Sequence, residues 1–292
     1  MTSRIKLPVV CLTIVCFQTL PAAALDFMGP PAAQLNKGKW SIGAEYTSGE
    51  MVFKAKGLAN LYRPPSWDWP SIRATHVHWM RIDGFDTRKT YATVGYGLTD
   101  SWDVITSLGT VKSNWSHIRQ TVQGGWRYRD EHEESHDLGL SLGLRKTLYT
   151  KGKLRLGALA KYSRLEMDDA WFHLYTRAPI TPRTLAISAE LVLDEVQVAA
   201  GGTYDLNKNL SIYGGPFFHW LDGKLRNPYI PLSPSWLGTY TAYGPYNLRR
   251  QQEFGAYIGG QMRPRKNMSF NIEYQHVGSA DCVGMSLLWR CK

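Results

Sequence analysis

The sequence predicts an all-β protein, and specifically a transmembrane antiparallel up-and-down β-barrel of about ten strands with short periplasmic turns and long extracellular loops. Three observations predict it. Of the 292 residues only 20% are charged, while glycines (27) and aromatic residues (12%) are frequent, which is typical of sheets joined by tight turns. Apolar and polar residues alternate in many segments. Short and long connections also alternate along the chain, as they do in outer-membrane barrels.

Composition excludes several other classes. No stretch after residue 25 has the roughly 18 apolar residues that a membrane-spanning helix needs. An apolar content of 43% excludes a disordered chain. A secreted β-sandwich remains the alternative fold, although a sandwich has no reason to sort its connections by length. The net charge is +10, but Lys and Arg are scattered and no nucleic-acid module is present, so we do not expect nucleic acid as a partner.

The first residues have the features of a signal peptide. Arg4 and Lys6 precede an apolar run over residues 7–20, and the small residues at 21–24 suit signal peptidase. Removing this leader lowers the net charge to +8, because it holds two basic residues and no acidic one. We therefore expect the cell outer membrane as the location, with three parts to the chain: a signal peptide over 1–24 cleaved near Ala24, an N-terminal periplasmic extension over 25–38, and an outer-membrane β-barrel over 39–292.

Alternation of apolar and polar residues places ten strands, an even number as bacterial barrels require. They are expected near residues 39–55, 75–97, 102–112, 137–147, 153–166, 184–204, 210–221, 252–262, 268–277 and 282–291. Turn-forming residues gather in four short connections at 98–101, 149–152, 205–209 and 263–267. Long aromatic and polar stretches at about 57–74, 113–136, 167–183 and 222–251 are expected to be the extracellular loops.

One predicted strand, 184–204, changes its apolar phase across Asp194-Glu195, which a β-bulge would explain. A hairpin at this position, with a second break at Asp83-Gly84, would instead give twelve strands. We expect ten strands, some of which project beyond the membrane.

Polar rows of the strands should face the lumen, because the apolar rows of a barrel face lipid. Eight charged or amide residues on these rows are predicted to line the lumen: Glu45, Arg145, Arg155, Lys161, Glu190, Asn271, Glu273 and Gln275. Buried charges of both signs in so narrow a space must pair. They would form either a structural salt-bridge plug or the wall of a selective aqueous path.

Aromatic residues fall into two groups. Those at strand ends or on outward rows are expected in the interfacial girdles: Trp40, Tyr46, Trp102, Tyr204, Tyr274 and Trp289. Those in the predicted loops either contact a glycan or lipid or pack over the barrel mouth: Trp67, Trp69, Trp115, Trp171 and Trp236.

Two histidine patterns resemble metal sites. Residues 132–136 match the HExxH zinc pattern, which needs a helix that presents both imidazoles on one face. The charged run over 127–131 favours a solvated loop instead. His76 and His78 share one side of a predicted strand and would need a third ligand from elsewhere. We expect no resident metal and no cofactor.

A barrel enzyme would need an acid, a base or a nucleophile at the rim. Asp168, Asp169 and His173 lie in one predicted loop and could meet His117 or His219. No spacing selects such a set over chance, so we expect no catalytic residue.

The C-terminal strand carries Gly284, Leu287 and Trp289 in a pattern that resembles the β-signal of outer-membrane proteins, although Arg290-Cys291-Lys292 follow it. Cys282 and Cys291 would lie roughly 30 Å apart in an extended strand, far beyond disulfide distance. They would then be free thiols or be paired between molecules.

Four segments resemble porin-like outer-membrane β-barrel proteins of Gram-negative bacteria: residues 28–31, 96–100, 211–217 and 271–276. The resemblance implies the fold and the location, and it brings no substrate or catalytic residue. We expect passive passage of small solutes or a structural role. The alternatives are an omptin-like protease, a lipid hydrolase, or a surface protein that binds glycans or lipids. Expected partners are outer-membrane lipid, lipopolysaccharide and, during insertion, the barrel-assembly machinery.

Overall fold

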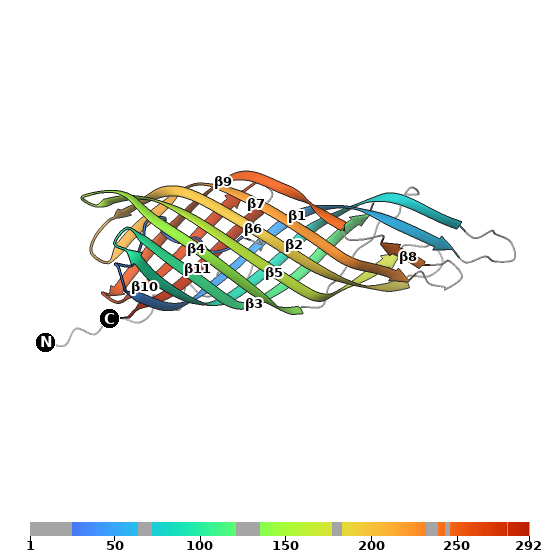
Figure 1. The fold of residues 1–292 in the computed structure, drawn as a ribbon, viewed down its shortest axis with the longest axis horizontal. Helices are drawn as coiled ribbons and strands as arrows, with labels where there is room; N and C mark the ends of the chain where they lie inside the picture. The colour runs from blue at the N-terminus through green and yellow to red at the C-terminus, as the bar shows by residue number, and fades with distance from the viewer. Residues whose placement is uncertain are drawn as a thin grey trace.

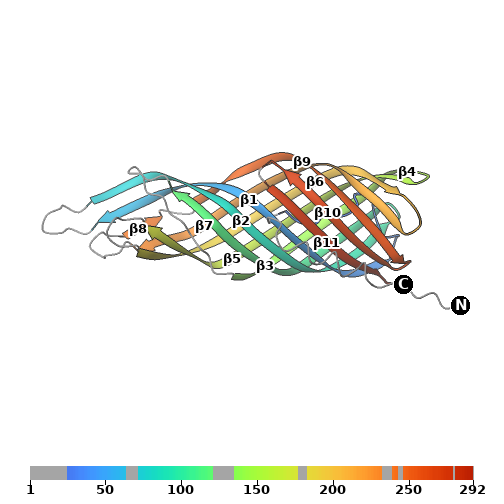
Figure 2. The same ribbon diagram turned by 180° about the vertical axis from the view of Figure 1, so that it is seen from behind.

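The computed structural model describes residues 25–63, 72–120, 135–176, 183–231, 239–242, 246–278 and 280–291. These residues form a single antiparallel sheet that closes on itself, because the last strand pairs with the first. Figures 1 and 2 show the resulting elongated barrel from its two sides. Its strands are β1 (Trp40–Arg63), β2 (Ile72–Thr99), β3 (Trp102–Gln120), β4 (Ser135–Lys151), β5 (Leu154–Thr176), β6 (Arg183–Asp205), β7 (Leu210–Pro231), β8 (Thr239–Ala242), β9 (Tyr246–Arg265), β10 (Met268–Val277) and β11 (Ala280–Arg290).

The prediction of a ten-stranded barrel is confirmed. Ten strands of ten residues or more build the wall, and β8 is a four-residue strand between β7 and β1 at the extracellular end. The predicted bounds agree well at the periplasmic ends. At the other end the strands run further, since β1 reaches Arg63 and β5 reaches Thr176. Within the described residues, no helix is long and apolar enough to cross a membrane.

The twelve-stranded alternative is wrong. Asp83-Gly84 lies inside β2 at a local register shift against β1, and Asp194-Glu195 lies inside β6. The predicted bulge at Asp194 is wrong as well, because β6 keeps its register there against β5. Leu193 and Glu195 both face the interior. The apolar row changes face because this strand leaves the membrane: lipid no longer covers the outside, and the apolar side chains turn inward.

The barrel narrows toward its extracellular end. β10 and β11 are short and meet in a tight turn at Gly278, whose positive φ of 43° suits glycine. Beyond this turn β1 pairs directly with β9, through Ala55 and Leu248, and then with β8. The upper part of the wall therefore lacks the β10–β11 hairpin, whose two strands are visible as the short red arrows beside the C-terminus in Figure 2.

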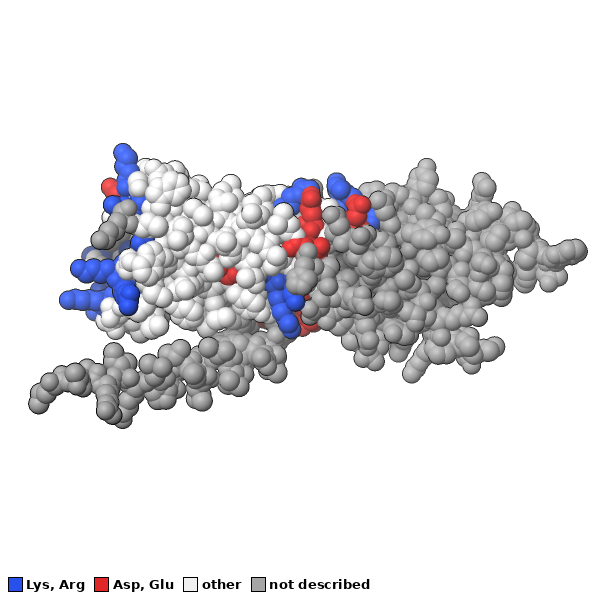
Figure 3. All heavy atoms as spheres, turned by 90° about the horizontal axis from the view of Figure 1, so that it is seen from below, with Lys and Arg blue, Asp and Glu red and all other residues white. Residues whose placement is uncertain are grey.

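The outer surface carries an apolar belt of exposed hydrophobic side chains. On the face drawn in Figure 3 this region is a nearly uncharged white band with charged residues at both edges. Along β6, the outward residues between Asp194 and Tyr204 are uncharged. These two residues are ten positions apart, about 33 Å along a strand, which projects to about 25 Å at the usual tilt and matches the apolar band of outer-membrane barrels. At the upper edge of the belt the Tyr162 and Tyr274 hydroxyls donate to Asp194 and Asp281.

A charge placed in the middle of this belt should destabilise the barrel. Val198 is 47% exposed on the outward face of β6, and Leu206 is 42% exposed in the periplasmic turn after it. Val198→Arg should lower the free energy of unfolding by about 2–4 kcal/mol, because lipid cannot solvate the guanidinium. Leu206→Arg is the matched control and should change little. Urea titration of both variants in lipid vesicles measures this, and equal losses would contradict the placement of the belt.

Candidate functional site: a lumen filled by the N-terminal segment

Residues 25–35, here called the N-terminal segment, lie inside the barrel. Leu25, Asp26, Phe27, Met28 and Leu35 are all buried, and their partners come from strands on several sides of the wall. The expectation of a periplasmic extension over 25–38 is thus wrong for residues 25–35. Local sequence patterns do not distinguish an irregular segment in the periplasm from one that returns into the lumen. Residues 1–24 lie outside the described residues, so the signal peptide stays a prediction.

The upper half of the segment is held by Glu273 on β10. Gly29 has a φ of +73°, and the backbone N–H groups of Met28 and Gly29 donate to the two Glu273 carboxylate oxygens at 2.7 and 2.8 Å. Pro30 and Pro31 follow, and they bring no N–H group that would need a partner in the lumen. The buried carboxylate is therefore satisfied by the segment itself.

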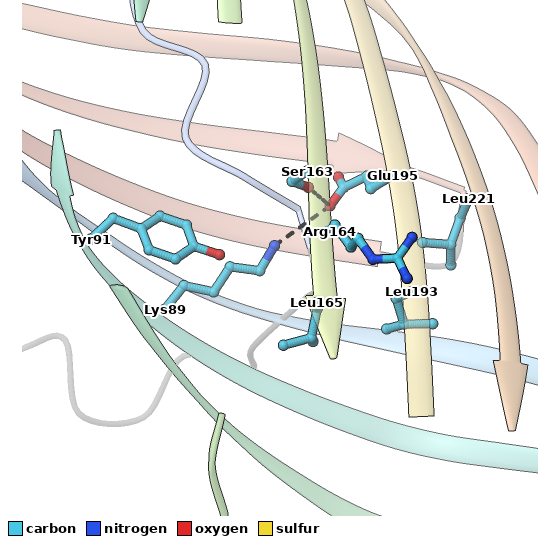
Figure 4. Close-up of a pocket in the computed structure, with 8 residues that line it drawn as sticks. All are labelled: Lys89, Tyr91, Ser163, Arg164, Leu165, Leu193, Glu195 and Leu221. Atoms are coloured by element: carbon cyan, nitrogen blue, oxygen red, sulfur yellow. Dashed lines mark hydrogen bonds and ion pairs between the residues drawn. The ribbon is translucent and has the colours of Figure 1, made fainter. Parts of the chain in front are cut away.

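A central charge cluster surrounds Asp26. The carboxylate of Asp26 accepts from Lys89 on β2 and lies 3.8 Å from Lys161 Nζ on β5. Lys161 also contacts Glu45 at 3.3 Å, and Lys89 contacts Glu195 at 3.5 Å. Figure 4 shows Lys89 extending across the lumen toward Glu195, which also accepts from Ser163. All five charged side chains are buried, so each depends on the others for its stability.

The lower half of the segment is anchored at the periplasmic end. Asp103 accepts the backbone N–H groups of Gln34 and Leu35 at 2.5 and 3.1 Å, while Arg145 donates to both oxygens of the same carboxylate. The backbone N–H of Ala33 donates to the Thr147 hydroxyl at 3.1 Å. Each of these hydrogen bonds can exchange with water.

Glycines in the wall leave room for the segment. A side-chain Cβ at Gly157 would lie 2.6 Å from the Ala32 backbone, and one at Gly284 would lie 2.7 Å from the Phe27 ring. Either contact is far shorter than a van der Waals distance. The wall thus provides both the space and the charged partners that the segment needs.

Above the central charge cluster the interior becomes apolar. Leu25 marks the transition, because its carbonyl oxygen lies 3.5 Å from the buried thiol of Cys282 on β11. The next inward side chains form an apolar layer toward the extracellular end: Met51, Phe85, Val111, Leu165, Met167, Leu191, Leu193 and Leu221. The lumen is thus closed by the segment below and by an apolar layer above it.

Most residues predicted to line the lumen point inward. Six are buried in the interior: Glu45, Arg145, Lys161, Asn271, Glu273 and Gln275. Arg155 is half-buried near the periplasmic mouth, where it contacts Asp205. The prediction is wrong for Glu190, which lies on the opposite face of β6 from the buried Leu191. Its side chain is 42% exposed and pairs with Arg226 at 3.9 Å. It belongs to the part of β6 where the outward row has become polar.

Sequence reasoning missed four buried charged residues of the lumen: Asp26, Lys89, Asp103 and Glu195. Lys89 could have been found, because it shares an inward row with Tyr91 and Thr93 on β2. Asp26 could not, since its partners are distant in sequence and its own segment has no periodicity.

Several predicted positions fall outside what the structure describes. Trp67, Trp69 and Trp236 lie in undescribed segments, as does most of the HExxH match. Trp115, Trp171, His76, His78 and His117 lie in strands whose side chains are not described there. Asp168, Asp169 and His173 belong to β5 and not to a loop, again without described side chains. His219 is buried in the lumen, 3.3 Å from Glu195, and does not lie at the rim.

Two further expectations concern metals and thiols. Among the described residues, no group of three or more His, Cys, Asp or Glu side chains could hold a metal ion. Cys282 and Cys291 are both free thiols, as the strand geometry predicts.

A closed antiparallel barrel with a polar lumen, an apolar belt and interfacial aromatic side chains defines a class, that of the outer-membrane β-barrel proteins. No protein-family model matches the chain, and no curated protein matches its sequence.

Several solved outer-membrane barrels have a similar fold. The outer membrane protease OmpT from Escherichia coli is 10% identical in sequence, with a TM-score of 0.42, and the match covers 91% of this chain and 97% of the OmpT chain. The outer membrane protein OprG from Pseudomonas aeruginosa is 10% identical, with 88% and 97% covered and a TM-score of 0.40. An outer membrane channel from Pseudomonas putida F1 is 12% identical, with 91% and 100% covered and a TM-score of 0.38. Likenesses this distant concern the fold alone and carry no argument about function.

The reactivity of the Cys282 thiol reports whether the N-terminal segment occupies the lumen. In a Cys291→Ser chain beginning at Leu25, the Cys282 thiol should react slowly with a water-soluble maleimide, because Leu25 covers it. Asp26→Ala removes the carboxylate between two buried lysines, which should destabilise the state with the segment in the lumen by about 3 kcal/mol. The fraction of molecules whose segment has left the lumen, and with it the labelling rate of Cys282, should rise roughly 100-fold.

Asp100→Ala is the matched control, because Asp100 is an exposed aspartate that accepts the backbone N–H of Lys37 just below the segment. Its labelling rate should stay at the parent value. Rapid labelling of Cys282 in the parent chain would show that the segment does not occupy the lumen.

Proposed function

We propose that this barrel passes small solutes across the outer membrane and that the N-terminal segment is the gate that closes its lumen. The observation that carries the proposal is the polar character of the wall behind the segment. A barrel with a purely structural role would be expected to fill its interior with side chains that satisfy one another. This wall instead keeps many polar groups that the segment does not use.

Several of these groups are fully buried and have no hydrogen-bond partner among the described residues. They include side-chain oxygens of Thr203, Gln197, Gln261, Ser269 and Asn271. A buried polar atom without a partner costs about 1–3 kcal/mol, and water normally removes this cost. The wall therefore has the composition of a hydrated passage, which favours transport over a permanent plug.

The way the segment is held also supports a gate. Lys89 and Lys161 hold it through the Asp26 carboxylate. Glu273 and Asp103 each accept two of its backbone N–H groups. Water can replace each of these interactions once the segment moves, so its release exposes charged groups to solvent rather than to lipid. The segment is also at one end of the mature chain if cleavage occurs near Ala24, and it can then withdraw without unthreading.

The apolar layer is part of the proposed closed state. Leu25 lies directly below it, and Phe27 lies against the wall at Gly284. When the segment withdraws, the layer loses the support of these apolar side chains and gains space below. A narrow apolar constriction of this kind blocks water and ions while it is dry and admits them when it widens.

Planar-bilayer recordings test this function. The chain beginning at Leu25 should be closed most of the time, and the same chain without residues 25–35 should show stepwise openings, because the lumen then holds water. A chain with a Gly/Ser sequence in place of residues 25–35 is the length-matched control and should also open.

A reversible lock distinguishes gating from a loss of structure. Ala33 and Thr147 are in contact, so Ala33→Cys with Thr147→Cys in the Cys291→Ser chain should form a disulfide that holds the segment in place. This chain should be silent when oxidised and should open intermittently when reduced. A deletion variant that folds into a heat-modifiable barrel but never conducts would contradict the proposal.

A further inference from the structure

Four arginines point into the lumen near its periplasmic mouth, and together they are called the arginine cluster. Arg145 comes from β4, Arg155 from β5, Arg263 from β9 and Arg290 from β11. Two carboxylates contact this cluster among the described residues, Asp103 and Asp205. The mouth therefore has more positive than negative charge, unlike the central charge cluster above it.

Neither carboxylate can neutralise more than part of this charge. Asp103 is occupied by Arg145 and by two backbone N–H groups of the N-terminal segment. One oxygen of Asp205 accepts from both Arg155, at 3.4 Å, and Arg263, at 2.5 Å. The Ser211 hydroxyl donates to that same oxygen at 2.6 Å. Two guanidinium groups thus share one carboxylate oxygen.

Arg290 adds a further charge without a carboxylate partner among the described residues. Its side chain donates to the Lys266 carbonyl oxygen at 3.4 Å. Its charge lies within electrostatic range of Arg263, Arg145 and Arg155, which repel it, and of Asp103, which attracts it more weakly. The Nε atoms of Arg155 and Arg263 are buried without a hydrogen-bond partner in the same described part of the chain. Uncompensated charge and unused donors therefore occur together at one place.

We propose that the arginine cluster is a binding site for a small dissolved anion with a phosphate or carboxylate group, which enters from the periplasm. Guanidinium groups bind such anions through paired, charge-assisted N–H donors. An anion between Arg155, Arg263 and Arg290 would use the donors that Asp205 leaves unpaired and would relieve their mutual repulsion. Exposed lysines on the adjacent turns, Lys151 and Lys208 among them, raise the local anion concentration.

This site is independent of the proposed passage. Arg155, Arg263 and Arg290 are partly exposed at the periplasmic mouth, below the segment, so the anion binds whether or not the barrel conducts. Its test is therefore a binding measurement and not a conductance measurement.

Calorimetric titration with inorganic phosphate, at constant ionic strength in chloride, tests the site in the barrel embedded in phosphatidylcholine nanodiscs. Saturable binding with one phosphate per barrel is expected. Arg290→Gln and Arg155→Gln should each weaken it by about tenfold, the loss expected for one charge-assisted hydrogen bond. Arg290→Lys keeps the charge but lacks the paired N–H donors, so its phosphate affinity should lie between that of these variants and that of the parent.

Lys151→Gln is the control for general charge attraction, since Lys151 is exposed on the turn and outside the cluster; it should weaken phosphate binding far less than Arg290→Gln does. Each variant is first checked for the heat-modifiable folded form. The site is overturned if the parent shows no saturable binding, or if Lys151→Gln weakens binding as much as Arg290→Gln. It is also overturned as a site for dissolved anions if phosphatidylglycerol nanodiscs abolish phosphate binding, because lipid headgroups would then occupy the cluster.

Discussion

The ion pairs of Asp26 with Lys89 and Lys161 are the interaction on which the interior of this barrel depends. Two lysines on β2 and β5 point into a narrow lumen, where each would be costly without a negative partner. Glu45 and Glu195 supply part of that charge, and the N-terminal segment brings the carboxylate that lies between the two lysines. The segment thus completes the packing of the wall, and the wall determines where the segment lies.

The lumen has three zones with different chemistry, and each follows from the position of the wall relative to the membrane. Near the periplasm the arginine cluster carries excess positive charge, and all of its members except Arg145 are partly exposed. In the middle, buried charges of both signs pair with the segment. Beyond the membrane the inward row of β6 becomes apolar at Leu193 and Leu191, because water now covers the outer face and the interior is the only place for these side chains.

Strand periodicity predicted the closed barrel, its strand number and its periplasmic turns, because a two-residue alternation reports directly on which face meets lipid. The same rule failed at Glu190, because there the strand has left the membrane, and its outward row is polar while its inward row is apolar. Periodicity also could not place the N-terminal segment. Residues 25–35 have no repeat, and their partners are far away, as for Gln275, which is 249 residues from Asp26 and donates to its carbonyl oxygen. Only the closed fold brings them together.

Hydrogen–deuterium exchange of the folded mature chain tests the central claim most directly, because it reports on the segment without any substitution. The backbone N–H groups of Met28, Gly29 and Leu35 are all bonded to buried carboxylates. Peptides that cover residues 25–35 should therefore exchange as slowly as those from β4, deep in the wall. Exchange of these peptides at the rate of an unfolded chain would contradict a lumen closed by the N-terminal segment.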